Sequence, residues 1–402
     1  MPDADAIATA APDMDAVRAD VEALASMQRG SAGPGERASA AWVAGRLGEA
    51  GVRDVVVEPF RYQGTYAWAH VAHAVAGLAA TRLRGWRGAA VAAGALCSLE
   101  LEASGRRQWL RRVLPGGEGA NVVARIPGAG ERRATLVVVA HHDAARTGLA
   151  WHPAIKQASA ARQLRRRAID PAMAPFGLAL GLAGAGAVAP GRTGRLLRGA
   201  ATGLLGLTIA AYLDIARSPV VPGANDNATG VAAVLELARQ VAAAPLPGVD
   251  LVVLTPGCEE SGMGGMAAFL AAHEAMLDPA HTLVLGLDGL GGGTPIVLTE
   301  EATLLRQRYR EQDVALAEAG ADRAGVARPQ RWRLGTWTDP ILAVFAGLPT
   351  ISILTVAEGY IPHHHLMSDT PANLDWPCVE ECIRIALGTA AVYAPGPLTT
   401  PD

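Results

Sequence analysis

The chain has 402 residues, enough to bury a large hydrophobic core and to form up to three domains. Its formal net charge of −3 at pH 7 provides no electrostatic argument for nucleic acid as a partner, and we expect none. The four cysteines indicate no disulfide framework, and Cys378 and Cys382, which have no second pair to complete a zinc knuckle, are expected to be core thiols. The N-terminal stretch contains acidic residues and no apolar segment of signal-peptide length, so we expect no secretory signal.

Predicted helices and strands alternate along most of the chain. Apolar residues at helical spacing predict a helix over residues 14–28, and a Gly/Pro turn precedes a second helix that ends at Gly51. Further on, strands are expected at 52–60, 119–128, 133–143, 249–257, 281–289 and 350–356, and helices at 230–244, 266–277, 338–349 and 376–388. This alternation indicates a three-layer α/β fold, in which a mostly parallel mixed sheet is flanked by helices and residues 1–402 form a single domain.

Two apolar segments interrupt this alternation. The first covers residues 65–104, and the second covers residues 150–218, with its apolar part at 170–216. Each consists of two apolar stretches joined by an arginine-rich tip, which predicts an inserted helical hairpin. A helix needs about 20 apolar residues to span a bilayer. The second hairpin approaches this length, whereas the first is shorter and contains His70 and His73.

The hairpins indicate membrane association, with a soluble helical cap or dimer arm as the alternative. Their many glycines and alanines suit close helix packing in lipid. Basic residues occur at both ends of the hairpins, with a slight excess at the end that adjoins the α/β domain. Under the positive-inside rule, this excess and the absence of a secretory signal favour a cytoplasmic location of the α/β domain. The alternative location is a soluble cytoplasmic protein.

Histidines and acidic residues follow the ends of several predicted strands. They are His141, Asp143, Asp226, Glu259, Glu260, Asp288 and the run 363–365. Taken alone, each has a structural explanation, such as a core histidine, a helix cap or a surface loop. The carboxyl ends of parallel strands gather at one crevice, however, so we expect these side chains to converge. Buried carboxylates and imidazoles without thiolates suit a zinc site that keeps a position open for water.

The motifs HHD, GANDNATG, CEESG, LDG and HLMSDTPANLD, in this order, resemble the M28 family of co-catalytic dinuclear zinc aminopeptidases. The resemblance extends to RGSAGPGERASAAWVAGRLGEAG, NVVARIPG and TDPILAVFAGLPTISI, so it covers most of the chain outside the two hairpins. It implies a peptide substrate and two zinc ions per chain, which activate a shared water and polarise the scissile carbonyl.

The resemblance implies five zinc ligands, which are His141, Asp226, Glu260, Asp288 and His365. Asp226 would bridge the two ions, with one histidine on each. His365 is preferred to its two neighbours because its spacing to Asp369-Thr370 matches the family pattern H-x-x-x-D-T.

Two further residues have catalytic roles by the same resemblance. Glu259 would act as the general base, which takes the proton of the attacking water and delivers it to the leaving amine. Asp143 would lie behind His141 and fix the orientation of its ring. Tyr360 or His364 is a candidate for stabilising the tetrahedral oxyanion, and loop packing is the alternative for both.

The sequence departs from the family pattern mainly in the long insertion between Asp143 and Asp226, which bears on substrate access. The position after Asp226 is Asn227, and the family's cis peptide after the bridging aspartate would fall at this bond. Thr229 stands where serine is commoner, which is a mild change.

Three functions follow as hypotheses from the resemblance. The first is a metallo-aminopeptidase. The second is a glutaminyl-cyclase-like acyltransferase, a relative that works with one zinc ion, and the presence of all five ligands argues against it. The third is a non-catalytic membrane protein that retains the peptidase fold, against which the intact Glu259 argues.

Overall fold

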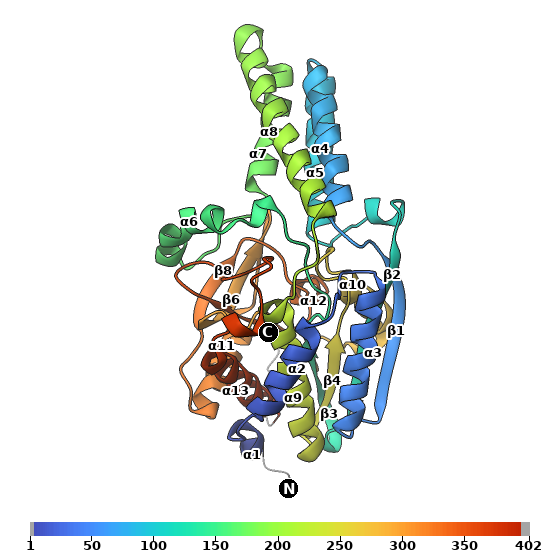
Figure 1. Ribbon diagram of the computed structural model, residues 1–402, viewed down its shortest axis with the longest axis vertical. Helices are drawn as coiled ribbons and strands as arrows, with labels where there is room; N and C mark the ends of the chain where they lie inside the picture. The colour runs from blue at the N-terminus through green and yellow to red at the C-terminus, as the bar shows by residue number, and fades with distance from the viewer. Residues whose placement is uncertain (1–3, 395–402) are drawn as a thin grey trace.

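A nine-stranded mixed sheet organises residues 4–394, the part of the chain that the computed structural model describes (Figure 1). The strands are β1 Asp54–Tyr62, β2 Gly117–Ile126, β3 Ala129–Val139, β4 Pro247–Thr255, β5 Thr282–Leu287, β6 Thr294–Ala302, β7 Arg306–Arg308, β8 Gln330–Leu334 and β9 Thr350–Val356. Their order across the sheet is β1-β2-β4-β3-β5-β9-β6-β7, and β8 pairs with β6.

The centre of the sheet is parallel. β4, β3, β5 and β9 run in one direction, and β2 and β6 pair with them antiparallel on either side. Residues 136–139 of β3 are all buried, as expected of a strand that is covered on both faces. Because the four central strands share a direction, their carboxyl ends open on the same edge of the sheet.

Helices flank the sheet, and the expected three-layer α/β fold is confirmed. They are α1 Ala4–Ala8, α2 Met14–Ala25, α3 Pro34–Glu49, α9 Gly230–Ala243, α10 Gly264–Ala272, α11 Glu311–Ala324, α12 Pro340–Phe345 and α13 Trp376–Tyr393. α2 and α3 pack on α9, and α11 packs on α13, while α10 and α12 contact each other and the strands beside them (Figure 1).

Several elements were not predicted from the sequence. β6, β7 and β8 lie at one side of the sheet, and α11 and α6 Pro153–Arg166 are polar helices. β6 ends in two glutamates that are buried by tertiary contacts, so its sequence lacks a clear strand pattern. α6 has a single buried residue, Gln163, and therefore shows no apolar stripe.

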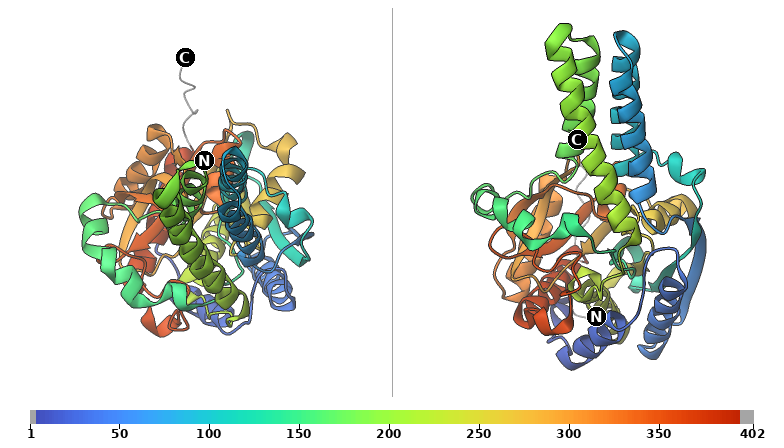
Figure 2. Two further views of the ribbon diagram at one scale, coloured as in Figure 1. Left: turned by 90° about the horizontal axis from the view of Figure 1, so that it is seen from above. Right: turned by 45° about the horizontal axis from the view of Figure 1, so that its top comes forward.

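The two expected hairpins are present and pack together as a four-helix bundle that projects from one end of the molecule (Figures 1 and 2). They consist of α4 Ala67–Arg82 with α5 Trp86–Ala103, and of α7 Ala174–Val188 with α8 Gly191–Arg217. Small residues allow this packing, since a Cβ on Gly77 would lie 2.5 Å from Leu180 Cδ2 and one on Gly88 would lie 2.6 Å from Ala187 Cβ.

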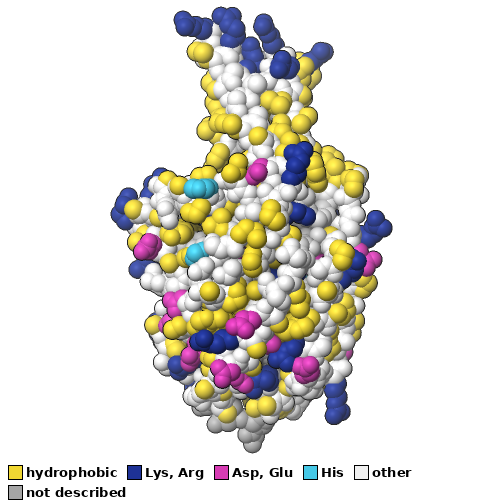
Figure 3. All heavy atoms as spheres, viewed as in Figure 1, with side chains coloured by type: hydrophobic (Ala, Val, Ile, Leu, Met, Phe, Trp, Pro, Cys, Tyr) yellow, Lys and Arg dark blue, Asp and Glu magenta, His cyan; other side chains and the backbone are white. Residues whose placement is uncertain are grey.

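The outside of the bundle is apolar, and its tip is basic (Figure 3). Exposed apolar side chains on it include Val75, Trp86, Leu178, Val188, Leu196 and Leu207. The tip carries the arginines at 82, 84, 87, 192, 195 and 198. Among the described residues, α8 is long and apolar enough to cross a membrane, and only 11% of its apolar window is buried.

A buried carboxyl connects β6 to the loop before α12. Glu301 accepts hydrogen bonds from the Thr338 backbone N–H (2.8 Å), the Thr338 hydroxyl (2.9 Å) and the Tyr309 hydroxyl. Burial raises the pKa of Glu301 to about 8, and these hydrogen bonds reduce the shift.

This raised pKa predicts a pH-dependent stability difference for Glu301→Gln, which keeps the shape but does not titrate. Since the folded pKa of about 8 lies above the ordinary value of 4.5, the stabilisation due to the protonated form is complete below pH 4.5 and is lost as the pH rises through 8. We expect the unfolding free energy of the wild type, relative to Glu301→Gln, to fall over this range by at most about 1.4 kcal/mol per pH unit.

Urea denaturation of both proteins at several pH values checks this difference. Glu311→Gln is the control, because the Glu311 side chain is 75% exposed and its removal should leave the pH dependence of the wild type in place. If the difference in unfolding free energy between the wild type and Glu301→Gln does not change with pH, Glu301 is ionised in the folded protein and the expectation is wrong.

Candidate metal centre

The predicted site residues meet at the carboxyl edge of the parallel strands. His141 follows β3, Asp288 follows β5, and the pair Glu259-Glu260 follows β4. Asp226 lies in the irregular segment Ala224–Thr229 that precedes α9, and His365 lies in the loop after β9. All five predicted zinc ligands are therefore brought to one place from five separate segments.

The distances divide these residues into two groups that share Asp226. His141 Nε2 lies 3.3 Å from Asp226 Oδ1 and 3.8 Å from Asp288 Oδ1. His365 Nε2 lies 3.3 Å from Asp226 Oδ2 and 3.0 Å from Glu260 Oε2. The two carboxylate oxygens of Asp226 thus face different histidines, which is the arrangement that a bridging ligand requires.

The electrostatics of this cluster indicate that it needs a cation. Burial, followed by the charge of Asp226, raises the pKa of Glu260 to about 7. Burial alone would lower the pKa of His365, but the carboxylates of Glu260 and Asp226 outweigh it and raise this pKa to about 9. Glu260 Oε1 and His365 Nδ1 are buried without a hydrogen-bond partner among the described residues. Divalent zinc would compensate these carboxylates, and imidazole and carboxylate are ligands that it prefers.

Asp143 connects the first histidine to the glutamate pair. Its Oδ1 lies 3.3 Å from His141 Nδ1 and accepts the Glu259 backbone N–H at 3.1 Å. Its Oδ2 accepts the Glu260 backbone N–H at 3.2 Å and the Ser31 hydroxyl at 2.6 Å. One buried carboxylate therefore orients the His141 ring and also holds the backbone that carries Glu259 and Glu260.

Asp369 and Arg29 hold the segment that carries Asp226. The Asp369 carboxylate accepts the backbone N–H groups of Asn225 at 2.7 Å and of Asp226 at 3.1 Å. Arg29 is fully buried and donates to the carbonyls of Asp143 (3.2 Å), Pro222 (3.0 Å) and Gly223. Arg29 was not predicted from the sequence, since it follows the first helix without any motif.

The peptide bond between Asp226 and Asn227 is cis, as the family resemblance implied. The Asn227 side chain donates to the Leu287 carbonyl (2.9 Å) and accepts the backbone N–H groups of Gly230 (3.0 Å) and Gly289 (3.1 Å). These bonds join the Asp226 segment to the end of β5, where Asp288 lies.

The three neighbouring histidines differ in position. His363 is directed to Ser368, with Nδ1 2.8 Å from the Ser368 hydroxyl, and only His364 and His365 lie next to Asp226. His364 Nε2 is 3.6 Å from Asp226 Oδ2. Of the two candidates for the oxyanion, His364 is therefore at the cluster, and the Tyr360 backbone forms a bridge with Ala357.

Three residues near the cluster were not assigned a role from the sequence. Trp151 lies edge-on to His365, with ring centroids 4.3 Å apart, and Lys156 Nζ lies 3.1 Å from His364 Nδ1. Asp339 begins α12 and is buried, with neither carboxylate oxygen hydrogen-bonded among the described residues. Burial holds the pKa of Asp339 well above its ordinary value. No sequence pattern connects these residues to the motifs, because the contacts arise from tertiary packing.

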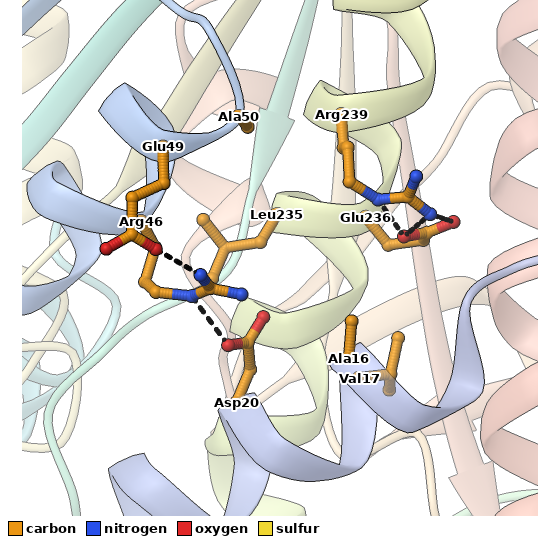
Figure 4. Close-up of a pocket in the computed structure, with 9 residues that line it drawn as sticks. All are labelled: Ala16, Val17, Asp20, Arg46, Glu49, Ala50, Leu235, Glu236 and Arg239. Carbon is orange, nitrogen blue, oxygen red and sulfur yellow. Dashed lines mark hydrogen bonds and ion pairs between the residues drawn. The ribbon is translucent and has the colours of Figure 1, made fainter.

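A small pocket of about 110 Å³ lies elsewhere, between α2, α3 and α9 (Figure 4). Arg46 Nε pairs with Asp20 Oδ1 at 2.8 Å, and Arg239 pairs with Glu236 on the same helix. Its charged groups are thus compensated within the protein, and we regard it as part of the helix packing.

We expect Asp369→Asn to weaken zinc binding about 10- to 100-fold, because the amide cannot accept both backbone N–H groups and the Asp226 segment loses its support. Zinc retention during competition with a chelator measures this change. Asp375→Asn is the matched control, since Asp375 caps α13 through the Cys378 N–H, a role that asparagine also performs. Equal zinc retention in the two variants would contradict the supporting role of Asp369.

Comparisons with known proteins agree with this geometry. Residues 200–390 match the sequence profile of Peptidase family M28. The fold is similar to the aminopeptidase of Aneurinibacillus sp. strain AM-1, with a TM-score of 0.61, 15% identity, and coverage of 99% of this chain and 98% of that chain. It is also similar to a Zn-dependent exopeptidase from Parabacteroides distasonis, with a TM-score of 0.55, 14% identity, and coverage of 95% of this chain and 99% of that chain.

A glutaminyl cyclase from Bacteroides thetaiotaomicron has a similar likeness, with a TM-score of 0.55, 14% identity, and coverage of 95% of this chain and 99% of that chain. The comparison with curated proteins gives no match. At these identities the solved structures establish the fold alone. The motifs' resemblance agrees with these findings: residues 200–390 match the profile of peptidase family M28, and nearly the whole chain shares its fold with a solved aminopeptidase and a solved Zn-dependent exopeptidase.

Proposed function

We propose that the protein is a zinc-dependent aminopeptidase, which removes N-terminal residues from peptides and is associated with a membrane. The observation that supports the catalytic part is the convergence of two histidines and three carboxylates, of which Asp226 is shared between the two histidines. Two zinc ions fit this arrangement. His141 and Asp288 would hold one, Glu260 and His365 would hold the other, and Asp226 would bridge them.

Bound zinc supplies an activated water and a Lewis acid for the scissile carbonyl. Glu259 is the residue that moves the proton. Its Oε2 lies 4.0 Å from His141 Nε2, at the edge of the cluster, and its side chain is 13% exposed. Burial holds the pKa of Glu259 well above its ordinary value, so the carboxyl can retain a proton between accepting it from water and delivering it to the leaving amine.

We expect Glu259→Gln to retain two zinc ions per chain and to lose peptidase activity about 10²- to 10⁴-fold, because the amide cannot accept the proton. Hydrolysis of aminoacyl-anilides and zinc analysis of the same preparation measure both quantities. Glu118→Gln is the control, since Glu118 is exposed and lies 3.9 Å from Arg37, away from the cluster. Near-normal turnover by Glu259→Gln would show that another group is the base.

The same measurements separate the rival functions. A glutaminyl-cyclase-like acyltransferase would retain about one zinc ion and release ammonia from peptides with N-terminal glutamine. A non-catalytic membrane protein would retain the fold without turnover. An aminopeptidase would hydrolyse peptides with a free N-terminus and leave their N-acetylated forms intact.

The membrane part of the proposal is supported by the surface of the bundle. α7 has 15 residues and no charged side chain, which corresponds to about 22 Å of apolar helix. Exposed apolar side chains cover the bundle, and arginines gather at its tip (Figure 3). An apolar shaft that ends in arginines suits insertion into a bilayer, with the guanidinium groups among lipid headgroups. We place the catalytic end in the cytoplasm.

We expect the full-length protein to sediment with membranes and to require detergent for release, whereas the combined variant Leu178→Asn, Val188→Asn and Leu207→Asn is soluble. These three side chains are 58%, 59% and 70% exposed on the bundle, so their replacement removes apolar surface without opening the core. Membrane fractionation followed by gel filtration measures the distribution.

The matched control changes three exposed apolar residues of the catalytic body, Val56, Val57 and Leu305, to asparagine. It should remain with the membranes. A full-length protein that purifies as a monomer without detergent would overturn the membrane proposal and favour a soluble cap.

A further inference from the structure

The insertion between β3 and the Asp226 segment places two side chains against the metal-binding cluster. Trp151 and Lys156 lie on the part of the insertion that precedes the bundle, Lys156 on α6. α6 approaches the loop after β9 closely, because Gly359 has φ +91° and a Cβ there would lie 2.2 Å from the Ala160 carbonyl oxygen. This close approach brings α6 next to the loop that carries His364.

Lys156 determines which nitrogen of His364 carries the proton. Its ammonium group donates to the His364 carbonyl at 2.5 Å and lies 3.1 Å from His364 Nδ1. Since an ammonium has only donors, Nδ1 must accept, and the ring proton then resides on Nε2. His364 Nε2 faces the cluster, 3.6 Å from Asp226 Oδ2. The result is an N–H donor that faces the cluster beside Asp226.

Trp151 restricts the orientation of the same ring. Its indole lies edge-on to both His364 and His365, with centroid distances of 5.4 and 4.3 Å, and the two imidazoles stack at 3.8 Å. The Trp151 indole N–H is buried and has no hydrogen-bond partner among the described residues. A buried donor without a partner costs free energy unless a bound ligand supplies an acceptor.

The choice of lysine is specific to this position. The chain has 35 lysines and arginines, and Lys156 is its only lysine. A compact ammonium can donate to two atoms of one residue, whereas a planar guanidinium is longer and has a fixed donor geometry. The single lysine of the chain therefore lies where one side chain donates to two atoms of His364.

We propose that Lys156 and Trp151 are positioning residues contributed by the insertion, which hold His364 so that its Nε2–H donates a hydrogen bond to the oxyanion. The inference rests on the proposed function. When water attacks, its oxygen bonds to the carbonyl carbon, the C=O electron pair moves to oxygen, and the water proton passes to Glu259. On collapse the C–N bond breaks, and the amine nitrogen takes the electron pair and that proton.

The first test measures kcat, KM and zinc content for Lys156→Met, His364→Ala and His364→Gln. We expect kcat to fall about 10-fold for Lys156→Met and about 100-fold for His364→Ala, with KM within about twofold of the wild type and two zinc ions retained. His364→Gln, which keeps an N–H donor, should recover part of the loss. Arg162→Met is the matched control, because it removes one positive charge from the exposed side of the same helix and should leave kcat unchanged.

A second measurement does not depend on turnover. A phosphinic peptide mimics the tetrahedral intermediate, so its affinity should fall by the same factors as kcat, whereas the affinity for the product amino acid should stay unchanged. Unaltered kcat and phosphinate affinity in Lys156→Met and His364→Ala would overturn the proposal.

Loss of one zinc ion in His364→Ala would also overturn it, by identifying His364 as a metal ligand. A wild-type protein that holds two zinc ions and hydrolyses no peptide would refute the proposed function and this inference together. If Lys156→Met and His364→Ala keep full activity and only Glu259→Gln loses it, this inference is refuted and the proposed function stands.

Discussion

The structure depends on one electrostatic constraint, which is the gathering of carboxylates and imidazoles at the carboxyl edge of four parallel strands. Asp226 is the centre of this arrangement, with one oxygen toward His141 and the other toward His365, each at 3.3 Å. Burial and the charge of Asp226 raise the pKa of Glu260, and the carboxylates of Glu260 and Asp226 outweigh burial to raise the pKa of His365. The fold therefore gathers carboxylates that a divalent cation would neutralise. They lie next to Glu259, the proposed general base.

The surrounding hydrogen bonds hold in place the backbone that carries these side chains. Asp143 and Asp369 each accept two backbone N–H groups from segments with predicted ligands, and Arg29 ties three carbonyls together from the interior. These groups have no need to touch substrate. Because these hydrogen bonds are buried, the loss of Asp143, Asp369 or Arg29 would leave backbone groups of the site without a hydrogen-bond partner.

The insertions connect the bundle to this assembly. At the base of α5, Glu102 forms a fully buried ion pair with Arg111 (3.2 Å), and Arg111 donates to the carbonyl of Ser261, next to Glu260. On the other side, α6 lies against the loop of His364 through Lys156. α5 of the bundle and the loop of Glu260 are thus connected through Arg111, and α6 of the second insertion contacts the loop of His364.

The sequence by itself determined the alternation of strands and helices, the two hairpins and the motifs at the strand ends, because these are local patterns of periodicity and spacing. It also indicated that His141, Asp226, Glu260, Asp288 and His365 would meet, since strands that run parallel bring their ends to one edge. Only the tertiary structure decided that Arg29, Trp151, Lys156 and Asp339 surround them. Lys156 and His364 are 208 positions apart. Neither the sequence of α6 nor that of the loop with His364 contains a pattern that predicts this contact. Such contacts depend on how separate segments pack. Gly359 allows α6 to approach the loop of His364, and the need for a glycine at this position is evident only when α6 is seen beside it.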